Sequence, residues 1–134
     1  MILDTNYLVA LGKNDECAFR KGVELVESGE TQWVPVPVIQ ELEYGVACTG
    51  SEAEKRRVRN VWNLYPPVEI NREIARRAGQ LAADADLGNG GTVGAAGIDS
   101  IDPMVAAVAD RFDDAVLTDN VSDFEALGVP VESF

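Results

Sequence analysis

Short apolar runs suited to β-strands alternate with amphipathic helical patterns along the whole chain. The strand-like runs cover residues 1–4, 31–36, 68–70, 115–118 and 129–131. Because a helical pattern separates each run from the next, the chain is predicted to form an α/β fold with a central, mainly parallel sheet of about five strands and helices on both faces. No internal repeat is present, and 134 residues suit one ordinary domain, so a single domain over residues 1–134 is expected.

Helix signals fill the segments between these runs. The expected helices cover residues 5–11, 15–28, 37–46, 51–64, 71–87, 99–112 and 120–127. Thr5 is the expected N-cap of the first helix and Asp99 or Ser100 of the sixth, because short polar side chains accept hydrogen bonds from free backbone N–H groups. Before the sixth helix, Gly88–Gly97 contains five glycines and predicts a loop, either a flexible flap over a site or a permissive surface connection.

The charge balance of the chain is unusual. It has 23 Asp and Glu residues against 11 Lys and Arg residues, no histidine, and a net charge of −12. This balance argues against nucleic-acid binding through a basic surface alone. Most of the acids are expected to reflect halophilic adaptation, since excess surface carboxylates keep a protein soluble in a salty cytoplasm where charges are strongly screened. A smaller group of acids would then form a site that needs cations.

Several reaction classes are excluded by the residues that are missing. Without histidine there is no Ser–His or Cys–His nucleophile pair, and Cys17 and Cys48, expected to be buried or half-buried in helices, are too far apart in sequence for a zinc site. No phosphate-binding loop or dinucleotide fingerprint is present. The opening MILDTN lacks the features of a secretory signal, and no apolar run can span a bilayer, so we expect a cytoplasmic protein without membrane association.

Acidic residues recur where the predicted elements would meet. Asp4 ends the first strand, Asp119 follows the run at 115–118, Asp102 and Asp123 fall in first helical turns, and Glu41 lies one turn inside a helix. Because the carboxyl ends of parallel strands share one edge, these side chains are expected to face the same rim. Their mutual repulsion calls for a cation, and Mg²⁺ or Mn²⁺ prefers such oxygen ligands. Taken singly, each acid could instead be a cap, a turn residue or a solvated charge.

Four segments, taken in order, resemble the signatures of a known family. MILDTNYLVA, VPVIQELEYGV, IDSIDPMVAAVA and AVLTDNVSDFEALGVPV are similar to successive motifs of PIN domains, with the ELxYG ending typical of VapC-type toxins. No single motif is specific, but their order and spacing over nearly the whole chain are. The resemblance places the family's glutamate on Glu41 rather than Glu43, and its helical aspartate on Asp102 rather than Asp99.

The closing motif of the resemblance leaves one position open. Asp123 matches the family's aspartate directly, whereas Asp119 is an additional acid beside Asn120. Either of the two could complete a metal site, and Asp123 is favoured by the motif.

The resemblance implies a three-layer PIN fold and an endoribonuclease that depends on one or two Mg²⁺ or Mn²⁺ ions. It also implies a small antitoxin protein as partner and a homodimer, since family members of this length are commonly toxins of toxin–antitoxin pairs. Asp4 and Asp102 would hold the principal ion, and Glu41 and Asp123 a second ion or the waters of the first. The candidate metal ligands are Asp4, Glu41, Asp102, Asp119 and Asp123, all but Asp119 are also catalytic candidates, and the supporting residues are Asn6, Thr118 and Asn120.

An RNA substrate must approach a strongly acidic chain, and two basic clusters offer contacts to its backbone. The candidates are Arg56, Arg57, Arg59, Arg76 and Arg77. The alternative is that they are solvated helix faces paired with acids at helical spacing. A non-catalytic PIN scaffold that binds RNA or protein is the alternative function, although a scaffold has no need of repelling carboxylates. A receiver-like phosphoacceptor domain is disfavoured because no lysine follows a late strand.

Overall fold

Five short strands and seven helices alternate in the computed structural model, which describes residues 1–134. The strands are β1 (Ile2–Leu3), β2 (Val34–Pro35), β3 (Pro67–Val68), β4 (Val116–Leu117) and β5 (Val131–Glu132). The helices are α1 (Thr5–Gly12), α2 (Glu16–Ser28), α3 (Val36–Thr49), α4 (Glu52–Leu64), α5 (Arg72–Gly88), α6 (Asp102–Phe112) and α7 (Val121–Ala126). None of the helices combines the length and the apolar character that a bilayer crossing requires.

The strands pair only in parallel, which confirms the predicted α/β class. β4 lies between β1 and β5, and β2 pairs with β3. Trp33, just before β2, joins the two groups, because its backbone N–H donates to Met1 O and its carbonyl accepts from Leu3 N, both at 2.9 Å. The resulting order is β3-β2-β1-β4-β5, with the carboxyl ends of all five strands at one edge.

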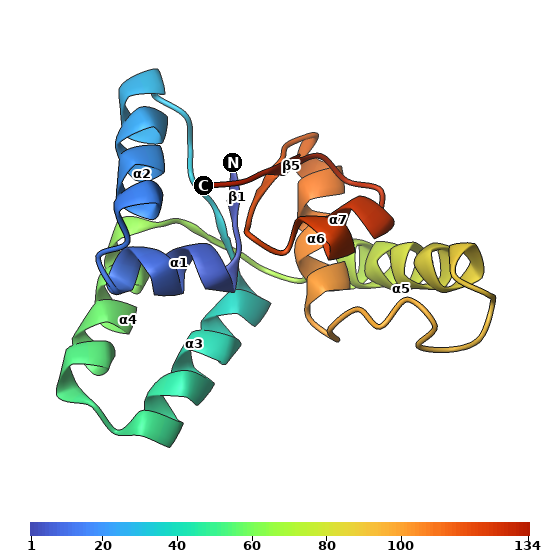
Figure 1. Cartoon of the computed structure of the whole chain (residues 1–134), viewed down its shortest axis with the longest axis horizontal. Helices are drawn as coiled ribbons and strands as arrows, with labels where there is room; N and C mark the ends of the chain where they lie inside the picture. The colour runs from blue at the N-terminus through green and yellow to red at the C-terminus, as the bar shows by residue number, and fades with distance from the viewer.

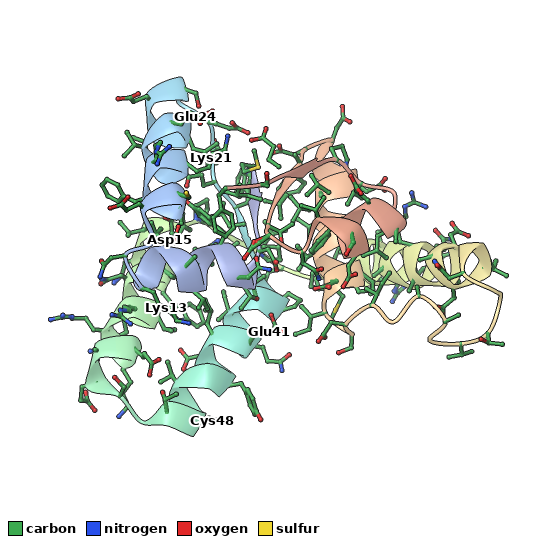
Figure 2. The ribbon with its side chains drawn as sticks, in the orientation of Figure 1. Lys13, Asp15, Lys21, Glu24, Glu41 and Cys48 are labelled. Atoms are coloured by element: carbon green, nitrogen blue, oxygen red, sulfur yellow. The ribbon has the colours of Figure 1, made fainter.

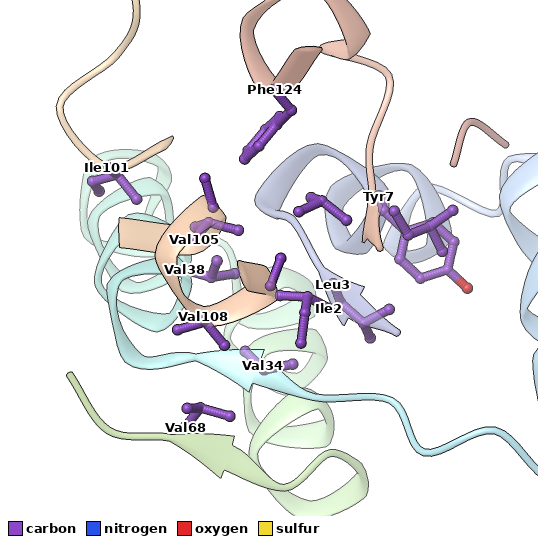
Figure 3. Packing of buried hydrophobic residues seen from close by; sticks show 14 of the residues in the cluster. Ile2, Leu3, Tyr7, Val34, Val38, Val68, Ile101, Val105, Val108 and Phe124 are labelled. Carbon is purple, nitrogen blue, oxygen red and sulfur yellow. The ribbon is translucent and has the colours of Figure 1, made fainter. Parts of the chain in front are cut away.

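Helices cover the strands on both sides and complete three layers. In Figure 1, α1 to α4 gather on one side of β1 and α5 to α7 on the other. The strand residues Ile2, Leu3, Val116 and Leu117 are fully buried, as expected of a parallel sheet enclosed on both faces. Figure 3 shows Val105 and Val108 of α6 packed among strand residues. This core fixes β1, which Asp4 directly follows, and α6, which begins at Asp102.

Two predicted helix N-caps and the predicted cysteine environment are wrong. Asp4, not Thr5, is the N-cap of α1, and its Oδ1 accepts from the Thr5 backbone N–H at 2.7 Å. Asp99 forms a turn before α6 by accepting from Ile101 N at 3.3 Å, and the helix begins only at Asp102. Pro103 explains that start, because its ring favours the first turn and carries no N–H that needs a cap. Both cysteines are exposed, on the solvent faces of α2 and α3.

The glycine-rich connection between α5 and α6 is a loop anchored to α5. The carboxylate of Asp86 accepts hydrogen bonds from the backbone N–H groups of Gly94 at 2.8 Å and Ala96 at 2.9 Å. Gly94 has a φ of +78°, a conformation that an L side chain would strain. Ala96 and Ile98 also pack against the core. The loop is therefore folded back by one side chain, and its two ends lie against α5 and at the start of α6 (Figure 1).

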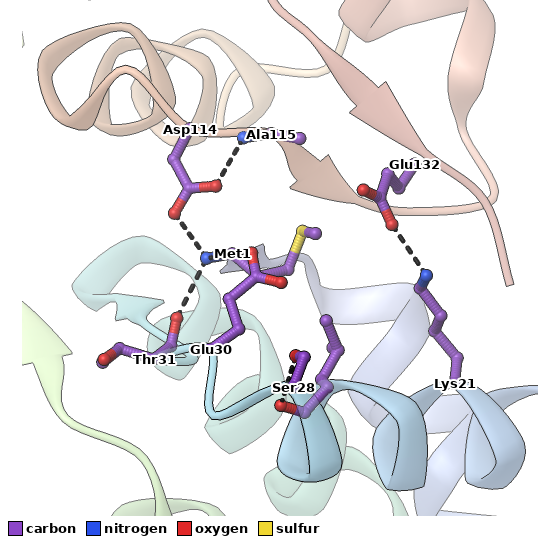
Figure 4. A network of polar contacts seen from close by, with 9 residues as sticks. Met1, Lys21, Ser28, Glu30, Thr31, Asp114, Ala115 and Glu132 are labelled. Carbon is purple, nitrogen blue, oxygen red and sulfur yellow. Dashed lines mark hydrogen bonds and ion pairs between the residues drawn. The ribbon is translucent and has the colours of Figure 1, made fainter.

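The Met1 ammonium is buried and fully partnered. It donates to Thr31 O at 2.9 Å and to Asp114, and Glu30 Oε1 lies 3.3 Å away (Figure 4). A buried charge is tolerated when opposite charges and hydrogen bonds compensate the loss of water. The buried carboxylates of Asp4 and Asp102, by contrast, have no cationic partner.

Candidate functional site

The sheet and its flanking helices bring the predicted acids to one edge. Asp4 directly follows β1, and Asp119 follows β4 after one residue. Asp102 is the first residue of α6, and Asp123 lies in the first turn of α7. Because strands that pair in parallel end at the same edge, these positions converge. The acids are close enough to interact electrostatically, since the charges of Asp4 and Asp123 both raise the pKa of Asp102.

Thr118 supports Asp4 from the neighbouring strand end. Its hydroxyl is fully buried and lies 2.7 Å from Asp4 Oδ2 and 3.1 Å from Asn6 Oδ1. A hydroxyl carries a single proton, and the nearer, charged oxygen is the stronger acceptor. The Thr118 oxygen in turn accepts from the Asn120 backbone N–H at 2.9 Å. The predicted supports Asn6, Thr118 and Asn120 thus form one network around Asp4.

Asn120 joins the acids of α6 and α7. Its side-chain nitrogen donates to Asp102 Oδ2 at 3.2 Å and to Asp123 Oδ2 at 2.8 Å. An amide has two N–H donors, so one side chain can hold both carboxylates. Asp123 is half-buried and linked to Asp102 in this way, whereas Asp119 is exposed and makes no side-chain hydrogen bond. The network therefore includes Asp123 and leaves Asp119 at its margin.

Glu41 and Glu43 point to different surroundings. The Thr5 hydroxyl at the start of α1 donates to Glu41 Oε2. Glu43, two positions later on α3, accepts instead from the indole N–H of Trp62 on α4 at 3.2 Å and is exposed. Thr5 was expected only as a helix cap, so its contact with Glu41 is an addition that sequence reasoning missed. No local signal predicts it, because the two residues are 36 positions apart.

The two deepest acids have no cationic partner. Asp4 is 4% exposed and Asp102 8%, and no Lys or Arg forms an ion pair with either. Burial, together with the charges of Asp4, Asp99, Asp123 and Glu41, raises the pKa of Asp102 to about 7. Burial also raises the pKa of Asp4, although the hydrogen bonds from Thr118 and Thr5 oppose the rise. The site is therefore a set of buried carboxylates that repel one another.

The chemistry of these donors fits a hard divalent cation. No group of three or more Asp, Glu or Cys side chains is arranged so that it could hold a metal ion together. Mg²⁺, however, keeps several waters and commonly takes only one or two carboxylates. Asp4 and Asp102 offer such a pair, and Asp102 accepts only one hydrogen bond, which leaves its second oxygen available. A cation would also remove the repulsion that raises the pKa of Asp102.

The predicted RNA contacts lie in different surroundings. Arg57 on α4 lines a groove that also contains Glu41, whereas Arg56 and Arg59 are exposed outside it. Arg77 forms a bidentate ion pair with Asp110 of α6, at 2.8 and 3.2 Å, and Arg76 is exposed. The structure therefore brings only one of the five arginines into a recess with a candidate site residue.

Comparisons with known proteins agree with this fold. VapBC2 from Rickettsia felis, bound to a DNA fragment from its promoter, shares 19% identity and a TM-score of 0.79 over 98% of this chain and 96% of that chain. DNA-bound VapBC from Salmonella typhimurium shares 23% identity and a TM-score of 0.76 over 98% and 96%. A toxin–antitoxin complex from Klebsiella pneumoniae shares 20% identity and a TM-score of 0.72 over 98% and 94%. These likenesses concern the fold.

Sequence comparison adds the family. No curated protein matches the chain. The PIN domain family, however, matches residues 1–129 of the 134. That match runs from the first strand to the segment before β5 and includes all the acids described above, so the chain belongs to the PIN domain family.

Proposed function

We propose that the protein is a metal-dependent endoribonuclease that acts as the toxin of a toxin–antitoxin pair. One observation carries the nuclease part: two buried carboxylates, Asp4 and Asp102, lie at the carboxyl edge of the sheet without a cationic partner. The repulsion between these carboxylates lowers the stability of the folded state. A purely structural role would not require two repelling acids. A non-catalytic PIN scaffold has no use for them.

Asp4 and Asp102 would hold Mg²⁺ or Mn²⁺, and Glu41 and Asp123 would bind a second ion or the waters of the first. When bound, such an ion polarises a phosphodiester and lowers the pKa of water. The chain's own residues supply orientation and proton transfer. Thr118 fixes the direction of the Asp4 carboxylate, and Asn120 fixes Asp102 and Asp123. A carboxylate that does not hold the ion directly, Glu41 or Asp123, accepts the proton of the attacking water.

The partner part of the proposal rests on the neighbouring folds. The similar structure from Klebsiella pneumoniae is a toxin–antitoxin complex. By extension, a small antitoxin would bind this chain and hold it inactive, and the chain would form a homodimer. Expression of the wild type alone should arrest growth of a host cell, whereas expression of Asp102→Asn should not. Equal growth with both chains at matched protein levels would contradict the toxin role.

The decisive experiment is an RNA cleavage assay with Mg²⁺, with Mn²⁺ or with a chelator, at low and at molar KCl. We expect cleavage by the wild type with either ion, and loss of cleavage with chelator or with Glu41→Gln. Glu43→Gln is the matched control, because Glu43 lies on the same helix but contacts Trp62. Cleavage that survives both the chelator and Asp102→Asn would overturn the proposed function.

A further inference from the structure

Two basic residues lie at the carboxyl end of α1. Lys13 directly follows the helix, and Arg57 reaches it from α4. The Cδ atom of Arg57 lies only 3.3 Å from where a Cβ on Gly12 would stand, so its aliphatic part lies across the end of α1. A glycine at this position leaves the room that Arg57 occupies. Figure 2 shows Lys13 at the end of α1 remote from Glu41.

Neither Lys13 nor Arg57 forms an ion pair, although the chain has twice as many acids as bases. Of the eleven basic side chains, three form ion pairs: Lys21 pairs with Glu24 and Glu132, Lys55 with Glu52, and Arg77 with Asp110. The nearest acid along α4, Glu54, accepts a hydrogen bond from the Thr49 hydroxyl instead. Two adjacent cations without a carboxylate partner thus persist in a chain of net charge −12.

A groove connects this pair to the candidate site. It lies between α1, α3 and α4 and encloses about 120 Å³. Its polar lining consists of Lys13, Arg57, Thr5, Glu41 and Glu54, and apolar side chains such as Leu8 and Val58 line the rest. Lys13 also borders a second recess on the other side of α1, together with Asn6 and Asp119. Since a helix rises about 1.5 Å per residue, the length of α1 places the cations roughly 12 Å from the acids.

We propose that Lys13 and Arg57 bind backbone phosphates of the substrate strand beside the scissile phosphate. The inference rests on the proposed ribonuclease function and names the path of the RNA to that site. The strand would follow the groove, with its reacting phosphate at the acids and a phosphate further along the strand at the cations. Arg57 can bind a phosphate through two N–H groups and Lys13 as a point charge. Such contacts position RNA without reading its sequence.

The structural alternative is that the pair only stabilises α1. Cations near a helix carboxyl end interact favourably with its dipole, an effect of about 0.3–1 kcal/mol. That role predicts a lower melting temperature when the charges are removed, with RNA binding unchanged. The proposed role predicts the reverse, because both side chains are exposed and fix no buried group.

The test measures binding of labelled single-stranded RNA as a function of salt, in the non-cleaving Asp102→Asn background. Loss of two phosphate contacts should lower the slope of log affinity against log salt by about 1.4, since each contact contributes roughly 0.7 for single strands. We therefore expect this change for Lys13→Gln with Arg57→Gln. Arg20→Gln with Arg111→Gln removes the same charge elsewhere and should leave the slope unchanged.

A wild-type slope in the Lys13/Arg57 variant, or an equal fall in the Arg20/Arg111 control, would overturn the proposal. The melting temperature of each variant excludes misfolding as the cause. The readout also separates this inference from the proposed function. If RNA binds through Lys13 and Arg57 but the wild type never cleaves it, the proposed nuclease function is wrong and the proposed RNA-binding path still holds.

Discussion

Asp86 and Asp102 stand at opposite ends of the glycine-rich connection, and their pKa values shift in opposite directions. Hydrogen bonds from the Ala96 and Gly94 backbone N–H groups lower the pKa of Asp86. Burial and neighbouring acids raise the pKa of Asp102 to about 7. The first carboxylate is stabilised by the folded chain as a charge, whereas the second is destabilised by it.

This difference distinguishes an acid that holds a loop from one that we propose to bind a cation, without reference to family. A carboxylate that holds a loop accepts hydrogen bonds from backbone N–H groups, and its charge therefore stabilises the folded state. A carboxylate placed to bind a cation has lost water without finding a partner in the protein, so the fold is less stable until the cation arrives. If the comparison is right, neutralising the two residues should have opposite consequences.

Asp102→Asn should give the largest effect. We expect at least a 100-fold loss of RNA cleavage, beyond the roughly 10–100-fold typical of residues that only support a metal ligand. The metal-free protein should at the same time melt several degrees higher at pH 8, because the amide keeps the hydrogen bond from Asn120 without the buried charge. A lower melting temperature with a chelator present would show that the Asp102 charge is compensated in the protein.

The stability of the metal-free protein should fall as the pH rises through about 7. The pKa of Asp102 is about 7 in the folded chain against an ordinary value of 3.8, so the folded state holds a proton that the unfolded state has released. Stability from this group is complete below about pH 4 and is lost above pH 7. Urea unfolding with a chelator at pH 5 and pH 8 measures the difference. Mn²⁺ should shrink it, and Asp102→Asn should remove most of it.

Thr118→Val should have an intermediate effect. The change keeps the shape of a fully buried side chain but removes the hydroxyl that donates to Asp4. The pKa of Asp4 should rise further, and affinity for Mn²⁺ should fall about 10–100-fold, as for other groups that orient metal ligands. Calorimetric titration with Mn²⁺ measures the affinity. An affinity equal to the wild type would mean that Asp4 does not depend on Thr118 for its orientation.

The sequence predicted most of the fold because its signals are local. Capping residues such as Asn71, whose side chain accepts from Ile74 N at 3.0 Å, mark helix starts directly in the sequence. Strand bounds were less accurate, since each strand is only two residues long and its pairing depends on distant partners. The junction between β1 and β2 rests on Trp33 alone, and no local pattern indicates such a bridge.

The positions of the acids at the candidate site were predictable from the sequence, but the hydrogen bonds that join them to other residues were not. Asp4 and Asp119 follow strand ends, and the shared edge of parallel strands is a general rule. The double donation by Asn120 and the contact between Thr5 and Glu41 depend on how α1, α3, α6 and α7 pack, which the sequence does not show. Arg57 was among the predicted RNA contacts, but its position near Lys13 at the end of α1 was missed, because the two residues are 44 positions apart.

Asp86→Asn should have the smallest effect on catalysis and a clear local one. One oxygen acceptor and the charge are lost, so the bonds to Gly94 N and Ala96 N weaken. Hydrogen exchange at these two amides should accelerate, while the helix amides of α6 keep their protection. In the wild type the protection of these two amides, relative to their intrinsic exchange rates, should likewise fall in acid, because a lowered pKa gives stability that is lost as the pH falls through it. RNA cleavage should stay within about threefold of the wild type, since no hydrogen bond joins the loop to a ligand candidate. A loss as large as that of Asp102→Asn would instead make the loop part of the site, and the two carboxylates would no longer divide into a structural and a functional one.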